Sequence, residues 1–477
     1  MHSTKLILLL KSLSSQEFRF FSEFVSSPLF NKNLKVISLL NSLKKYYPEF
    51  ENSNFTNENI YKKVFPGENY NYFKLKNIIS DLLALGKEFL AVDHFRNNPD
   101  MKTKILLEQY RDRNLDNMFL QLYNAFEKKL DETPAKDEHY FLSKLEITEE
   151  LKSFYSPKEP NAHFNLFQDQ LDFFANYSII RLLRLYNIML HETKQNNYAF
   201  DMKMLDEVLS YIKNNKNEEY PTILLYYYII LLEKESDEKY FFELKALKEK
   251  HFDEFNKYDK YMYFLHMAGY CADVYNNKCS TEFAYEHFLL SKENFDSGTI
   301  ELGKILYMDF LNHVKIALRV NEFDWAENYI NTFKDKLTEE KESTLNFCNA
   351  FINYKKGDLT SAMDLLSRTN FPSFIIKIQV KLLLLQINFE MGYFEQALNM
   401  IDSFKHYLAR EKNFIEYQRK AFNDFISITG DLIKFKTGNN NEKSGFNFEK
   451  IKKDIEKINF NQFGIKLWLE DRIKDFE

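Results

Sequence analysis

The residues best suited to chemistry are ten histidines, three cysteines and several pairs of adjacent glutamates. Zinc binding needs a second His or Cys at helical spacing, and none of the histidines has one. Cys271 and Cys279 also lack a nearby set of partner ligands. The pairs Glu149–Glu150 and Glu339–Glu340 are typical of solvated helix surfaces or of helix starts, where acidic side chains are favoured. We therefore predict no metal ligand, no cofactor and no catalytic residue.

The motifs of common enzyme classes are missing as well. The chain has no HExxH, GxSxG, GxGxxG or Walker-type sequence, and only 11 glycines from which a phosphate loop could be built. The sequence thus predicts a protein that is not an enzyme. An enzyme whose catalytic pair is assembled from distant residues stays open as an alternative.

Length and composition predict an all-α protein. A chain of 477 residues is too long for one ordinary core. The 11 glycines and 9 prolines are far below the roughly 7% and 5% of globular proteins, so tight turns are few and elements are long. Hydrophobic residues make up 45% of the chain, which is enough for a continuous core.

Charge and cysteine content indicate the compartment and the kind of partner. The 64 basic and 70 acidic residues give a net charge of −6, which does not favour a nucleic-acid partner. An odd count of three cysteines is typical of a reducing compartment. The apolar run Leu6–Leu10 is short for a signal peptide, and no stretch is long and apolar enough for a membrane span. We expect a soluble cytoplasmic protein without a membrane partner, and its oligomeric state stays open.

Residues 1–95 are predicted to form an N-terminal helical module. Ser14 and Glu17 have the spacing of a capping box, and Thr56 is a candidate N-cap. The pair over 56–92, a short helix, a turn and a longer helix, resembles a helix-turn-helix. The longer helix begins with side chains that could read DNA: Asn71, Lys74, Lys76 and Asn77. Acidic residues balance these lysines, so a DNA-binding transcriptional or signalling regulator is kept only as an alternative function.

Residues 100–215 are predicted to be a long-helix region. Two long helices are expected over 101–155, followed by a proline-containing linker at 156–161. The apolar run 223–232 favours a buried helix over a buried strand, because no alternating pattern surrounds it.

Residues 311–408 repeat one pattern three times. A glycine or asparagine follows one helix, an aromatic residue or leucine begins the next, and an alanine comes three residues later. Ala326 and Ala362 are 36 residues apart, and Ala362 and Ala397 are 35 apart. The turn residues of the three copies are Asn321, Gly357 and Gly392. The coinciding apolar positions are Leu311, Phe347 and Leu382; Val314, Ala350 and Leu385; Leu318, Tyr354 and Phe389; and, in the second helix, Ile330, Leu366 and Ile401.

This spacing resembles the tetratricopeptide repeat, whose antiparallel helix pairs stack into a right-handed superhelical array. The residues that carry the resemblance are Gly357-Asp358-Leu359 with Ala362, and Gly392-Tyr393-Phe394 with Ala397. The family's early tryptophan and closing proline are missing, and the period exceeds 34 residues. The resemblance implies a divergent α-solenoid over 220–435, with capping helices over 446–477.

In tetratricopeptide repeats the first helix of each pair lines a concave groove. Carried over position by position, the resemblance implies six groove residues: Lys315, Arg319, Phe351, Lys355, Gln386 and Glu390. Cations beside an aromatic ring could clamp an acidic or C-terminal peptide segment. Each of the six could equally be an ordinary solvated helix residue. The sequence therefore predicts a protein–protein interaction scaffold or adaptor whose partner is a protein or peptide.

Overall fold

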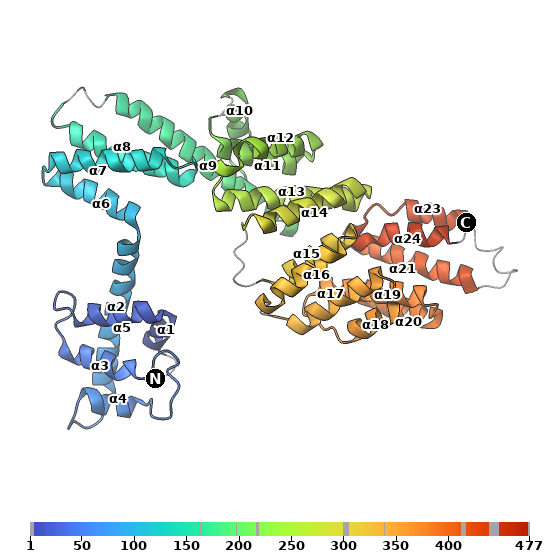
Figure 1. The fold of residues 1–477 in the computed structure, drawn as a ribbon, viewed down its shortest axis with the longest axis horizontal. Helices are drawn as coiled ribbons and strands as arrows, with labels where there is room; N and C mark the ends of the chain where they lie inside the picture. The colour runs from blue at the N-terminus through green and yellow to red at the C-terminus, as the bar shows by residue number, and fades with distance from the viewer. Residues whose placement is uncertain are drawn as a thin grey trace. The chain divides into compact units, whose positions relative to one another are not determined.

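The computed structural model is helical in every part that it describes (Figure 1). The described residues are 4–159, 161, 164–196, 198–215, 219–298, 305–337, 339–411, 416–437 and 448–475. Within these ranges there is no β-strand, only an isolated bridge between Ile305 and Leu337. The predicted all-α class is confirmed. None of the helices in these ranges combines the length and the apolarity that crossing a membrane requires.

The chain forms two compact units. One comprises residues 1–132 with 143–172, and the other comprises residues 133–142 with 173–477. The four segments predicted from the sequence stay predictions, because compactness alone does not define independent domains.

The first unit begins with five helices that enclose one core. They are α1 (Lys5–Ser12), α2 (Ser15–Ser26), α3 (Leu34–Lys44), α4 (Asn57–Val64) and α5 (Tyr72–Asn97). The predicted capping box is present: the Ser14 hydroxyl accepts the N–H of Glu17, and the Glu17 carboxylate accepts the N–H of Ser14. Thr56 caps α4 as predicted. Phe21 and Tyr61 lie fully buried in the core between these helices.

The next stretch contains three helices instead of the two predicted over 101–155. They are α6 (Pro99–Asp112), α7 (Asp116–Asp131) and α8 (Glu138–Tyr155). The extra break lies at Asn114, whose φ of 52° is left-handed. Asparagine enters that region more readily than other residues that have a Cβ. Of the predicted linker at 156–161, Pro160 lies outside the described residues.

The second unit is a succession of helix pairs joined by short turns. The long helix α9 (Phe164–Asn196), which belongs in part to the first unit, and α10 (Leu205–Asn215) precede them. The pairs are α11 (Pro221–Glu235) with α12 (Glu238–His251), α13 (Lys257–Lys278) with α14 (Thr281–Asp296), α15 (Tyr307–Arg319) with α16 (Phe323–Phe333), α17 (Lys341–Lys355) with α18 (Leu359–Ser367), and α19 (Phe374–Glu390) with α20 (Phe394–Arg410). Helices α21 (Glu416–Thr437), α23 (Phe448–Glu456) and α24 (Ile465–Lys474) follow. The run 223–232 lies in α11, so the predicted buried helix is confirmed.

Three of these pairs turn through the same left-handed position. Asn321, Gly357 and Gly392 have φ values of 63°, 86° and 76°. Positive φ suits glycine, and asparagine is the usual second choice. In each copy the next residue donates its N–H to a carbonyl five residues earlier, which satisfies a free end of the first helix. The three turns predicted from the sequence are therefore confirmed.

The repeated alanines are also placed as the spacing indicates. Ala326, Ala362 and Ala397 are all fully buried. A small side chain allows two helices to approach closely, whereas a larger one pushes them apart.

Replacing Ala362 with leucine is expected to lower the free energy of unfolding of the second unit by about 1–3 kcal/mol, because extra methylene groups overfill a packed interface. Urea unfolding followed by far-ultraviolet circular dichroism measures this change. Thr360→Leu, at an exposed neighbouring position, is the matched control and should stay within about 0.5 kcal/mol of the parent. Equal effects at the two positions would show that Ala362 is not at a tight helix contact.

Candidate ligand-binding cavity

A cavity of about 670 Å³ lies within the second unit. Its walls come from α13, α14, α15, α17 and α19, and from the C-terminal η3 (Gln462–Gly464) and α24. This volume falls in the range of about 300–1,000 Å³ that is usual for ligand pockets. All six predicted groove residues line it: Lys315, Arg319, Phe351, Lys355, Gln386 and Glu390. The structure thus brings the six together, while their role in binding stays a prediction.

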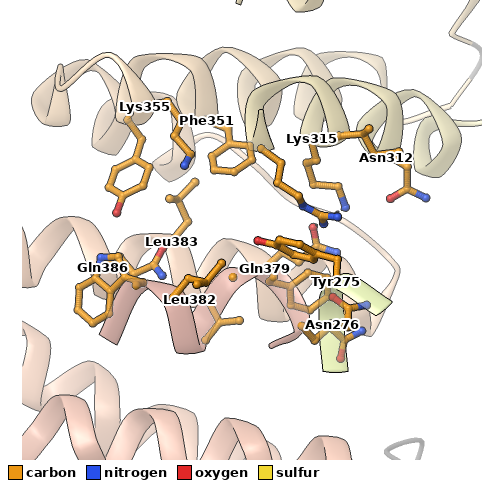
Figure 2. Close-up of a pocket in the computed structure, with 18 of the residues that line it drawn as sticks. Tyr275, Asn276, Asn312, Lys315, Phe351, Lys355, Gln379, Leu382, Leu383 and Gln386 are labelled. Carbon is orange, nitrogen blue, oxygen red and sulfur yellow. Dashed lines mark hydrogen bonds between the residues drawn. The ribbon is translucent and has the colours of Figure 1, made fainter. Parts of the chain in front are cut away.

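The side chains reach the cavity from opposite sides (Figure 2). Lys315 on α15 and Phe351 and Lys355 on α17 point into it from one side. Gln379, Leu382, Leu383 and Gln386 of α19 line the other side. The cavity therefore presents cations, amides and apolar groups to the same space.

The three cations of the cavity have few partners of their own. The Lys315 ammonium donates to Oε1 of Gln379 at 2.8 Å. The Arg319 guanidinium lies over the ring of Tyr275, 4.1 Å from its centre. Within the described part of the chain, none of Lys315, Arg319 and Lys355 has a carboxylate oxygen within 4.0 Å. Their positive charge is therefore not balanced by ion pairs in the free protein.

Burial changes the ionisation of these groups. Burial, followed by the charge of Arg319, lowers the pKa of Lys315 to about 7. The same two causes lower the pKa of Lys355, although its side chain keeps contact with solvent. Burial lowers the pKa of His287 to about 3, with smaller contributions from Arg319 and His313. His287 is therefore a neutral imidazole at pH 7.

Glu390 differs from the other five predicted residues because its carboxylate is already engaged. Its Oε1 accepts the Tyr354 hydroxyl at 2.7 Å and the Trp468 indole N–H at 2.7 Å. The guanidinium of Arg472 is 3.8 Å away. Glu390 therefore links α17 and α19 to the C-terminal helix.

The C-terminal segment forms a wall that the sequence did not predict. Phe463, Leu467 and Trp468 line the cavity, although this part of the chain was expected only to cap the last repeat. The backbone N–H of Asn461 donates to the carbonyl oxygen of Asn276 at 2.6 Å, so the segment reaches back to α13. The one sequence signal for this wall is that Trp468 is one of only two tryptophans, a residue type that often anchors contacts.

The other face of α24 holds it in place. Ile465, Leu469 and Ile473 are buried in a cluster with residues of α21, beside which α24 runs (Figure 1). Residues 438–445, whose glycines and asparagines predict a loop before this segment, lie outside the described residues.

The predicted DNA-reading side chains at the start of α5 are partly engaged. The Asn71 side chain accepts the backbone N–H of Lys74 and so caps the helix. The Lys74 ammonium pairs with Glu68 at 2.7 Å. Lys76 and Asn77 are exposed. DNA recognition stays a prediction. Asn71 and Lys74, two of its four candidate side chains, do not support it because they are engaged within the protein.

Histidines and acidic residues are not gathered for metal binding in the ranges described. No group of three or more His, Cys, Asp or Glu side chains there is arranged to hold a metal ion. Comparison of the chain with protein families, with curated proteins and with solved structures gave no match. Its function is therefore inferred from the cavity.

Proposed function

We propose that this chain is a non-enzymatic interaction scaffold that holds a segment of a partner protein in the cavity. One observation carries the proposal: six residues chosen for their repeat positions, on three successive first helices, line a single space. Equivalent positions of repeated helices face the same way, and here the space that they face has the volume of a ligand pocket.

We also propose that α15–α20 are three divergent tetratricopeptide-like repeats within a right-handed solenoid of helix pairs. The matched left-handed turns and the buried alanines support this. The three cysteines are free thiols, which agrees with a cytoplasmic location.

The lining favours an acidic segment. Lys315, Arg319 and Lys355 supply positive charge that no ion pair engages within the described residues, and charge complementarity guides recognition at such surfaces. Phe347 and Phe351 add aromatic surface for the side chains of the segment.

Selection of a random peptide library on the full chain is expected to enrich acidic peptides that bind in the cavity. Lys355→Glu should weaken their binding by about tenfold or more, because like charges then face each other. Fluorescence anisotropy of labelled peptides measures the affinity. The matched control is Lys377→Glu, an equal charge reversal at an exposed position of α19 outside the cavity. The proposal fails if no peptide is enriched, or if both variants bind as the parent does.

The pKa of Lys315 also favours a second candidate, an enzyme that uses a lysine amine. A pKa of about 7 leaves much of this amine neutral at physiological pH, as lysine bases and nucleophiles require. Among the described residues, Lys315 has one hydrogen-bond partner, the side-chain amide of Gln379. This amide cannot take up the proton that the Lys315 ammonium releases when it becomes neutral. Mass spectrometry of a metabolite mixture incubated with the protein tests this candidate. Turnover that is lost in Lys315→Met would favour it over the scaffold.

A further inference from the structure

The cavity contains a cluster of positive charge that the protein itself does not neutralise. Lys315 and Arg319 are one helical turn apart on α15, and Lys355 lies on α17. All three line the cavity, and none of them has an ion pair within the described part of the chain.

The two carboxylates on the cavity wall form no ion pairs with these three cations. Glu390 is held by Tyr354, Trp468 and Arg472. Oδ1 of Asp471 accepts a hydrogen bond from Nζ of Lys474 at 3.2 Å. Neither lies within 4.0 Å of the three cations, so they form no ion pair with them, although both act on the charge of Lys355 from farther away.

Donors that lack acceptors surround the cluster. Arg319 makes no hydrogen bond within the described part of the chain, and its guanidinium lies over the ring of Tyr275. Gln386 is only 8% exposed and lines the cavity, yet its amide has no hydrogen-bond partner among the described residues. The donors of both groups therefore remain available to a ligand in the cavity.

The electrostatic cost of the cluster points to a strongly charged ligand. Burial, followed by the charge of Arg319, lowers the pKa values of Lys315 and Lys355, so a bound anion would favour their charged forms. A carboxylate brings one negative charge and two acceptor oxygens. A phosphate monoester brings about −1.5 to −2 charges and three acceptor oxygens at neutral pH. A phosphate monoester therefore matches three cations and a free amide better than a carboxylate does.

We propose that Lys315, Arg319 and Lys355, with the amide of Gln386, form a subsite for a phosphate monoester. On the proposed function, which this inference deepens, the phosphate belongs to a phosphorylated residue of the bound protein segment. Arg319 and the two ammonium groups bind the phosphate oxygens, since cation–phosphate hydrogen bonds are among the strongest in proteins. Phe351 and Tyr275 then lie beside the phosphate and contact the rest of the residue that carries it.

Inorganic phosphate is the first probe. Calorimetric titration of the full chain at pH 7 and constant ionic strength should show saturable binding at least about tenfold tighter than that of acetate. Arg319→Gln and Lys355→Gln should each weaken phosphate binding by about tenfold. Lys377→Gln, outside the cavity, should leave it unchanged. Phosphate binding no tighter than acetate binding, or no effect of either cavity variant, overturns the subsite. Thermal melting of each variant shows whether a lost response comes from misfolding.

Peptide libraries separate this inference from the proposed function. Three libraries share degenerate flanks and carry phosphoserine, glutamate or serine at the fixed central position. Preferential binding of the phosphoserine library, lost in Arg319→Gln, supports both proposals. Equal binding of the glutamate and phosphoserine libraries overturns the phosphate subsite and keeps the scaffold. Binding of inorganic phosphate without binding of any library keeps the subsite and overturns the scaffold.

Discussion

Replacing Trp468 with alanine is expected to lower the free energy of unfolding by about 3–5 kcal/mol. The Trp468 ring is 9% exposed and contacts Phe389 and Phe425, with ring centres 5.3 and 5.6 Å apart. Its indole N–H is also a donor to the Glu390 carboxylate. The substitution therefore removes a large apolar contact and leaves a half-buried carboxylate short of one donor. Urea unfolding of the full chain, followed by circular dichroism, measures the loss.

Two companion variants sharpen this test. Trp468→Phe keeps most of the packing and removes the hydrogen bond, so it should cost about 1.5–3 kcal/mol. Tyr393→Ala removes an aromatic side chain that is 44% exposed and should change stability by no more than about 0.5 kcal/mol. If Trp468→Ala were as mild as Tyr393→Ala, α24 would not form the wall of the cavity in solution.

Replacing Lys315 with methionine is expected to stabilise the free protein at pH 7 by about 1–2 kcal/mol. Methionine has nearly the same length but no charge to bury and none to repel Arg319. The gain is reduced because the buried Gln379 amide loses the Lys315 donor. The same substitution should weaken phosphate binding, so stability and binding change in opposite directions. Such a trade-off is typical of residues kept for function.

The pH dependence of this gain gives a sharper test. The pKa of Lys315 in the folded protein, about 7, is below its ordinary value of 10.5. Between these values the folded state binds fewer protons than the unfolded state, so the parent protein gains stability from this group as pH rises. The advantage of Lys315→Met should therefore be largest at or below pH 7 and should disappear by about pH 10.

This pH dependence is measured by unfolding the parent protein, Lys315→Met and Lys377→Met at pH 6.5 and at pH 9.5. The exposed Lys377 should give no pH-dependent difference. Other titratable groups near Lys315 cancel when parent and variant are compared at each pH. These groups are Tyr275 of α13, His287 of α14, Arg319 of α15, Cys348, Tyr354 and Lys355 of α17, Glu390 of α19, and Asp471 and Arg472 of α24. An equal gain at both pH values would show that the charge of Lys315 is not its cause.

Local features of the fold could be predicted because neighbouring residues control them. The capping box of Ser14 and Glu17 needs only residues three apart. The left-handed turns at Gly357 and Gly392 need only a residue that tolerates positive φ. Asn114 carried the same kind of signal, and the break there was missed because an isolated asparagine is a weaker indication than a repeated glycine.

One side of the cavity could be predicted and the other could not. Lys315 and Lys355 were found because equivalent positions of repeated helices face the same way. Trp468 was missed because it meets Glu390 across 78 residues of sequence, and no periodic pattern relates the two. The unpaired state of Arg319 was also beyond prediction, since it depends on which carboxylates the fold brings near.

The backbone bond from Asn461 to Asn276 has a consequence for how the second unit opens. Repeat proteins commonly unfold piece by piece, because each repeat contacts only its immediate neighbours. Here the C-terminal segment contacts α13 and also α19 through Glu390, so it spans the intervening helix pairs. No single pair between them can separate fully before this segment is released. We therefore expect the helices from α13 to α24 to unfold cooperatively as one block, and not as a row of independent repeats.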